Sequence, residues 1–232
     1  MTRRTLDELA LAHDTDKSSR VHDYARTYDR HFAGMRDSVR TVLELGVYGG
    51  ASLRMFRDYF ERATVHGLDS NARRATSGER IKFWHGDQAD ETLLARIVED
   101  CGGSIDLVVD DAAHTNVAQW SSFRLLWKHV SPGGVYVVED TCCSYWPEYQ
   151  NSFPPNDEST ISRLLALVHD VNFRGYRSDD KATRGAKTLL DGLARHGTPP
   201  SLEGMLDDVD EIAFANGTTL LRKRGELAGG EP

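Results

Sequence analysis

The fold is decided by residues 105–140, IDLVVDDAAHTNVAQWSSFRLLWKHVSPGGVYVVED. Its pattern of apolar runs and polar breaks predicts a strand, a loop, a helix, a turn and a second strand. A crossover helix between two strands of one sheet makes them parallel and right-handed. The carboxyl ends of both strands therefore meet at one edge of the sheet, where open α/β sheets bind their ligands.

Each of these two predicted strands ends in a pair of acids. Asp110 and Asp111 follow IDLVV, and Glu139 and Asp140 follow VYVV. Carboxylates gathered at one edge repel one another unless they are protonated or bridged by a cation. His114 follows Asp111 by three residues, at the same edge. We expect a site for a hard metal ion with a neighbouring base.

Each of these residues also has a purely structural interpretation. Asp111 could cap the following helix, Asp140 could be a solvated turn residue, and His114 could be a surface residue at a helix start. One acid pair alone would favour that interpretation. Two pairs on neighbouring parallel strands favour the metal site instead.

The bulk properties indicate a globular protein. Of the 232 residues, 39% are hydrophobic and 28% are charged, and the net charge of −8 argues against nucleic acid or an anionic membrane as the main partner. No apolar run approaches the roughly 20 residues of a membrane helix, and the first residues have no signal-peptide core. Cys101, Cys142 and Cys143 form no disulfide framework. We expect a reduced, cytoplasmic protein.

The rest of the chain continues the alternation of strands and helices. We expect strands at 41–45, 64–69 and 81–85, and helices within 5–32, 52–60, 91–100 and 161–171. Two apolar runs around Asn216 and Gly217 predict an antiparallel hairpin. The fold class is therefore α/β, with a doubly wound, Rossmann-like sheet that is mostly parallel and ends in an antiparallel C-terminal hairpin. We expect one domain over 1–232, with an N-terminal helical segment at 1–38 and a mobile insertion or lid at 172–208.

A glycine-rich turn, ELGVYGG at 44–50, follows the first strand and opens a helix. Glycine allows a sharp turn and a close approach by a ligand. Asp69 ends the next strand, where an acid usually accepts hydrogen bonds from ribose hydroxyls. Asp87 and Gln88 follow the third strand, where they would contact a base, and Asp90 would cap the next helix. This pattern predicts a nucleoside cofactor, although the glycine spacing differs from the GxGxxG of nicotinamide enzymes.

Six motifs together resemble the class I S-adenosylmethionine methyltransferases: VLELGVYGGASLRMF, HGLDS, GDQAD, DDAAH, PGGVYVVEDT and SYWPEY. More narrowly, they resemble the metal-dependent sugar O-methyltransferases typified by the mycinamicin macrolide enzyme. TDKSS and VHDYARTYDRHF, within 15–32, are similar to the N-terminal segment of that group. The resemblance covers about residues 6–150 and the final hairpin. The size suggests the short actinobacterial members, among them the methylmannose polysaccharide 1-O-methyltransferase of mycobacteria.

The resemblance implies a role for each matching residue. The implied metal ligands are Asp111, Glu139 and Asp140, and the implied general base is His114. The predicted cofactor contacts are Glu44, Gly46, Tyr48, Ser52, Asp69, Asp87, Gln88 and Asp110. The aromatic residues Tyr145 and Trp146 are the predicted substrate contacts. Ala112 and Ala113 stand where the family has a Gly-Ser type pair, which affects the shape of the pocket.

The predicted reaction is methyl transfer from S-adenosyl-L-methionine to a hydroxyl of a sugar or glycoside, with Mg²⁺ or Mn²⁺ as the metal. The expected partner is a small-molecule or oligosaccharide acceptor, and we expect a homo-oligomer, a dimer in the simplest case. A catechol-type O-methyltransferase would use the same metal chemistry. A nicotinamide oxidoreductase is opposed by the glycine spacing. A non-catalytic cofactor-binding subunit is opposed by the acid edge with its histidine.

Overall fold

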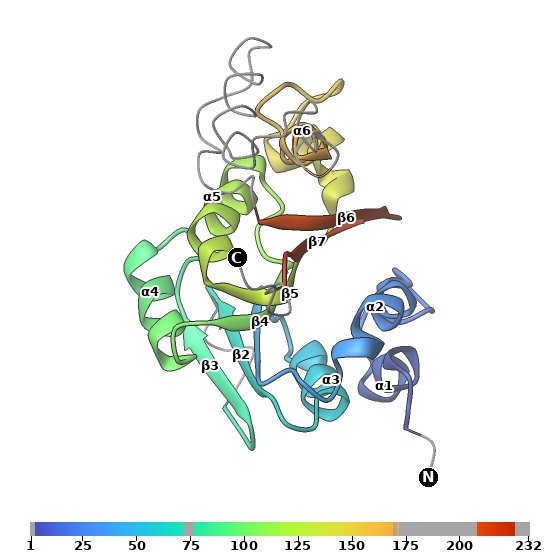
Figure 1. The fold of residues 1–232 in the computed structure, drawn as a ribbon. Helices are drawn as coiled ribbons and strands as arrows, with labels where there is room; N and C mark the ends of the chain where they lie inside the picture. Colours follow the sequence, from blue (N-terminus) through green and yellow to red (C-terminus); the bar gives the residue numbers. More distant parts are fainter. Residues whose placement is uncertain (1–2, 72–76, 169–170, 172–207, 226–232) are drawn as a thin grey trace, which may run out of the picture.

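The structure is a computed structural model and describes residues 3–71, 77–168, 171 and 208–225. Within these residues the centre is a seven-stranded sheet with the order β3-β2-β1-β4-β5-β7-β6 (Figure 1). The strands are β1 Thr41–Leu45, β2 Thr64–Asp69, β3 Ile81–His85, β4 Ile105–Asp110, β5 Val130–Val138, β6 Val209–Ala215 and β7 Thr218–Lys223. The first five pair in parallel, and β7 is antiparallel to β5 and to β6. This confirms the predicted sheet and hairpin.

The helices alternate with the strands. The α-helices are α1 Leu6–His13, α2 Tyr24–Phe32, α3 Ala51–Tyr59, α4 Glu91–Asp100, α5 Asn116–Leu126 and α6 Thr160–Ala166. The 3₁₀ helices are η1 Ala33–Met35, η2 Trp127–His129, η3 Thr141–Tyr145 and η4 Pro147–Tyr149. In the described part of the chain, no helix has the length and apolar character that a membrane crossing requires.

The local signal for the start of α4 holds, and the larger differences from the predicted boundaries are at α6 and β5. Asp90 caps α4 by accepting a hydrogen bond from the amide of Leu93. Helix α6 ends at Ala166, earlier than expected. Strand β5 already begins at Val130 and includes the SPGG segment, which we expected to be a turn, because a shift of register against β4 accommodates it. Of the predicted insertion or lid at 172–208, residues 172–207 lie outside the described residues, and the single-domain organisation stays a prediction.

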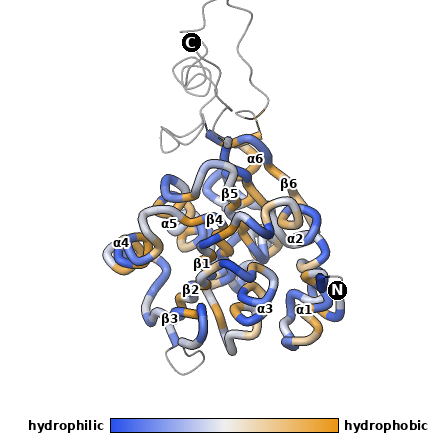
Figure 2. The backbone as a smooth tube through the Cα atoms, turned by 60° about the horizontal axis from the view of Figure 1, so that its bottom comes forward, coloured by the Kyte–Doolittle hydropathy of each residue, from blue (hydrophilic) through white to orange (hydrophobic). Residues whose placement is uncertain are grey.

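Helices cover both faces of the sheet, because strand side chains alternate in direction (Figure 1). Val42 of β1 belongs to the core that α1, α2 and α3 close, whereas Leu43 belongs to the core of α4, α5 and α6. The hydropathy view shows hydrophobic segments gathered along the central strands (Figure 2). Odd and even positions near a strand end therefore face opposite sides of the sheet.

The connection between α1 and α2 is tied to both helices by backbone hydrogen bonds. The Thr15 amide donates to the carbonyl of Ala10, and the carbonyl of Lys17 accepts from the amide of Ala25. This loop carries the side chain of Lys17 to a position with only 2% exposure.

The strand order reverses direction between β1 and β4, which creates the crevice where ligands of such sheets bind. The turn after β1 is pressed against this point, since the Gly46 amide donates to the carbonyl of Leu68 and the Asp111 amide donates to that of Leu45. Gly46 has φ +79°, and a Cβ there would lie 2.1 Å from the backbone oxygen of Asp111. Only glycine satisfies both the backbone conformation and the available space.

Gly46→Ala should therefore destabilise the protein strongly. Backbone strain alone contributes about 1–3 kcal/mol, and the steric overlap adds to it. Gly49→Ala is the matched control, because a Cβ at Gly49 meets nothing within 4 Å. Urea denaturation of both variants measures the difference, and equal stability would show that the turn can move away from β4.

Candidate active site at the carboxyl edge of the sheet

The acid pair at the end of β4 is divided between the two faces of the sheet. Asp110 is fully buried on the α5 side, where it accepts hydrogen bonds from Gln88, Ser122 and Tyr136. Burial raises the pKa of its carboxyl to about 6. Asp111 points to the opposite face. The expectation of four carboxylates at one edge is thus corrected to three, because neighbouring residues of a strand alternate.

Asp110 lines neither of the two cavities described below, and its predicted contact with the cofactor stays a prediction. Its observed partner, Gln88, does line a cavity. The side-chain oxygen of Gln88 accepts from the amide of Ala113 at 2.9 Å. Asp110 therefore orients a residue of the pocket and remains outside it.

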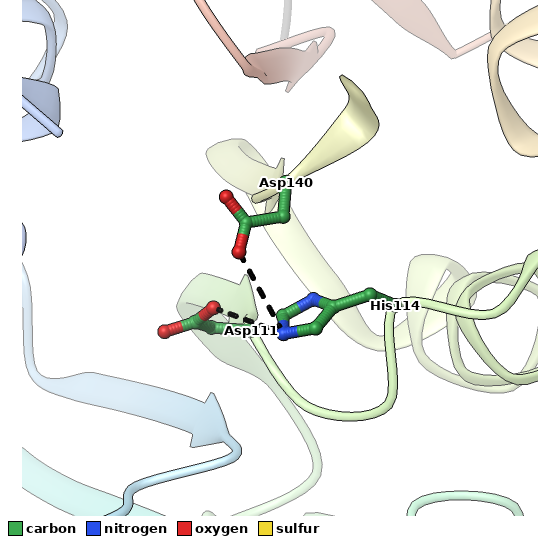
Figure 3. Close-up of side chains that lie close together, drawn as sticks. All are labelled: Asp111, His114 and Asp140. Carbon is green, nitrogen blue, oxygen red and sulfur yellow. Dashed lines mark ion pairs between the residues drawn. The ribbon is translucent and has the colours of Figure 1, made fainter. Parts of the chain in front are cut away.

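Asp111, His114 and Asp140 converge from the ends of β4 and β5 (Figure 3). The His114 Nε2 atom lies 3.6 Å from Asp140 Oδ2 and 4.0 Å from Asp111 Oδ1. One ligand atom from each residue falls within 4.8 Å of the others. These side chains keep 17–23% exposure, so a cation and a substrate can reach them. Oxygen ligands and an imidazole at this spacing fit a divalent cation.

Glu139 lies next to this cluster but is directed inward. Its Oε1 accepts from the Tyr28 hydroxyl at 2.5 Å and its Oε2 from Lys17 Nζ at 2.8 Å. Tyr24 of the same helix, α2, donates to Asp140 Oδ1 at 2.6 Å. Helix α2 therefore holds both acids that follow β5.

Lys17 is the residue of the candidate site that the sequence patterns did not single out. Its Nζ lies 2.5 Å from Asp111 Oδ2 and 3.5 Å from Glu44 Oε1, in addition to its contact with Glu139. Burial alone would lower the pKa of Lys17, but the three carboxylates raise it well above its ordinary value. A lone lysine in the polar stretch TDKSS looks like a solvated residue, and only its place in a stretch similar to a known family set it apart.

A cavity of about 200 Å³ lies beside the acid edge, at the ends of β1, β2 and β3. Four of the predicted cofactor residues line it, namely Gly46, Asp69, Asp87 and Gln88. Asp69 Oδ2 accepts from the amides of Val47 and Tyr48, both at 3.1 Å, so it also fixes the glycine turn. The structure brings these four residues together at one cavity, and their contact with a cofactor stays a prediction.

A second cavity, of about 160 Å³, lies on the other side of the glycine turn. Gly46 lines both cavities, and Tyr48, Ser52, Lys17 and Asp111 line the second. Ser52 donates to Glu44 Oε2 at 2.7 Å, which leaves Glu44 Oε1 without a hydrogen-bond partner in the described part of the protein. Burial raises the pKa of Glu44 to about 7. The two cavities share Gly46, and the second extends to Asp111 of the acid cluster; the crevice below means these two neighbouring cavities.

The aromatic residues after β5 differ in their distance from His114. The ring of Tyr149 meets the His114 ring edge-on at 5.7 Å, and Trp146, 48% exposed, lies 6.2 Å from Tyr149. Tyr145 lies against Phe153 instead, at 6.4 Å. Tyr149, the third aromatic residue of SYWPEY, is therefore the one beside the predicted base.

Comparisons with known proteins agree with this geometry. Residues 43–141 match the family model described as a methyltransferase domain. The structure of the MycE methyltransferase from the mycinamycin pathway, in complex with Mg and SAH, aligns over 100% of this chain and 56% of that one, with 29% identity and a TM-score of 0.79. The chain is a relative of the sugar O-methyltransferases and has the class I methyltransferase fold.

Two curated relatives have sugar-directed activities in their names. The chain is 37% identical over 177 residues to the 8-demethyl-8-alpha-L-rhamnosyl tetracenomycin-C 2'-O-methyltransferase of Streptomyces olivaceus, covering 73% of this chain and 46% of the relative. It is 35% identical over 189 residues to the mycinamicin VI 2''-O-methyltransferase of Micromonospora griseorubida, covering 78% and 47%. The chain thus spans about half the length of the curated relatives it matches.

The contact between Tyr28 and Glu139 should contribute measurably to stability. Tyr28→Phe leaves a buried carboxylate oxygen without its donor, so the free energy of unfolding should fall by about 1–3 kcal/mol. Tyr24→Phe is the matched control, and its loss should be smaller because Asp140 is 23% exposed and water can replace the donor. Urea denaturation of both variants tests this, and equal losses would contradict it.

Proposed function

We propose that the protein transfers a methyl group from S-adenosylmethionine to a hydroxyl of a sugar or glycoside, in a reaction that needs a divalent cation. One observation carries the proposal. Asp111 belongs to the cluster with His114 and Asp140, and it also lines the crevice around Gly46. A cofactor in that crevice would therefore lie directly beside a cation and a base. The names of the relatives support a glycoside as the acceptor.

The polar residues that line the crevice support this cofactor. Asp69 would accept hydrogen bonds from the ribose, and Asp87 and Gln88 would contact the adenine in the larger cavity. The methionine end would occupy the smaller cavity, near Tyr48 and Ser52. Glu44 lies behind this cavity, where it accepts a hydrogen bond from Ser52 and its other oxygen faces Lys17, so we retain its predicted role as one exerted through Ser52.

The acid edge fits a hard cation. Asp111 and Asp140 offer carboxylate oxygens in the accessible cluster, and we retain Glu139 as the third ligand predicted from the sequence. When bound, S-adenosylmethionine supplies an electrophilic methyl group and the cation stabilises negative charge on oxygen. The protein has to orient the acceptor hydroxyl and accept its proton.

His114 is placed to accept that proton at Nε2, which faces Asp111 and Asp140. Tyr149 and Trp146 form an aromatic surface next to it, suited to the apolar face of a sugar ring. Tyr145 keeps its predicted substrate role as a neighbour of this surface. The oligomer and the cytoplasmic location stay predictions.

Methyl transfer should appear with glycoside acceptors and disappear with EDTA. A panel of sugars, glycosides and catechols with labelled methyl donor measures the acceptor class, and Mg²⁺ or Mn²⁺ should restore the lost activity. Full turnover in chelator-treated protein would remove the metal from the mechanism. Transfer to catechols alone would favour the diphenol alternative. Calorimetry with S-adenosylhomocysteine and with NADH checks the cofactor separately.

His114→Ala should slow the reaction while binding survives. Loss of a positioned base lowers the rate of methyl transfer by about 10²–10⁴-fold. Single-turnover kinetics measures the rate, and titrations with Mn²⁺ and S-adenosylhomocysteine measure both binding steps. His129→Ala, at the opposite end of β5, is the control. A large loss of Mn²⁺ affinity in His114→Ala would make the histidine a metal ligand, and an unchanged rate would make it structural.

A further inference from the structure

The ammonium of Lys17 contacts two of the acids that the proposed cation would bind, Asp111 and Glu139. Lys17 Nζ donates to Asp111 Oδ2 at 2.5 Å and to Glu139 Oε2 at 2.8 Å. Both residues are also proposed as metal ligands. A carboxylate oxygen that pairs with an ammonium is a weaker ligand for a cation, and two positive charges at such close range repel. Asp111 presents its other oxygen, Oδ1, to His114, so the lysine and a cation bound there would act on the same carboxylate from two sides.

Lys17 has a further partner within reach. An ammonium carries three N–H donors, and Asp111 and Glu139 use two of them. Glu44 Oε1 lies 3.5 Å from Nζ, beyond good hydrogen-bond distance, and has no hydrogen-bond partner among the described residues. A small movement of the ammonium would therefore satisfy Glu44. The lysine would stay buried and paired during that movement.

We propose that Lys17 is a positioning residue that competes with the divalent cation for Asp111 and Glu139, and that Glu44 takes up its ammonium when the cation binds. The proposal rests on the metal site of the proposed function. It assigns the buried lysine a role in setting the affinity for the cation, beyond that of an ion pair that holds the fold.

Titration with Mn²⁺, followed by electron paramagnetic resonance of the free ion, tests the competition without any assay of activity. Lys17→Met is nearly isosteric and removes the charge, so Mn²⁺ should bind on the order of tenfold more tightly than to the unaltered protein. Lys17→Arg keeps the charge and should not bind Mn²⁺ more tightly. Lys82→Met is the matched control, because Lys82 is half exposed and pairs with Asp100, and its Mn²⁺ affinity should be unchanged.

Glu44→Gln tests whether Glu44 takes up the Lys17 ammonium. This variant keeps the proposal testable even if Lys17→Met does not fold. The ammonium then loses its alternative carboxylate, so Mn²⁺ binding should weaken by on the order of tenfold. Glu211→Gln is the matched control, because Glu211 is half exposed and pairs with Arg222, and its Mn²⁺ affinity should be unchanged. In the Lys17→Met background the effect of Glu44→Gln should disappear, since the coupling acts through the lysine.

The outcomes separate this proposal from the one on which it rests. If the unaltered protein binds no Mn²⁺, the metal site fails, and this inference fails with it. If the unaltered protein binds Mn²⁺ but Lys17→Met binds it equally or more weakly, the metal site stands and the competition is refuted. If Glu44→Gln binds Mn²⁺ as the unaltered protein does, the movement to Glu44 is refuted.

Discussion

The ammonium of Lys17 lies beneath the carboxyl edge of the sheet, in contact with Asp111 and Glu139 and near Glu44. A buried charge without a partner is strongly unfavourable, so a substitution at one of these side chains leaves the charge of another uncompensated. The same contact docks the loop between α1 and α2 against β4 and β5. The N-terminal helices and the arrangement of the acid edge therefore depend on one interaction.

The alternation of side chains along each strand explains why this interaction can form. In β1, Val42 and Glu44 share the face covered by α1–α3, while Leu43 packs on the other face. In β4 the same alternation sends Asp111 toward Lys17 and Asp110 toward α5. A shift of one residue in either strand would turn these acids into the wrong core. The site is thus a consequence of register as much as of composition.

The glycine turn links this acid group to the crevice. Gly46 packs so tightly on the backbone of Asp111 that no Cβ fits between them, and Asp69 holds the amides that follow the glycine. A ligand in the crevice is therefore brought close to the acid cluster by the backbone itself. In reactions that join a donor and an acceptor, such fixed proximity is a large part of catalysis.

The sequence by itself determined the order of strands and helices, the glycine turn and the edge at which Asp111, His114 and Asp140 meet. These follow from local periodicity and from the handedness of parallel crossovers, which act over short stretches of chain. Only the tertiary structure decided that Asp110 faces away, that Tyr149 adjoins His114, and that Lys17 is buried among the acids. Lys17 and Glu139 are 122 positions apart, and no local pattern encodes a contact over that separation.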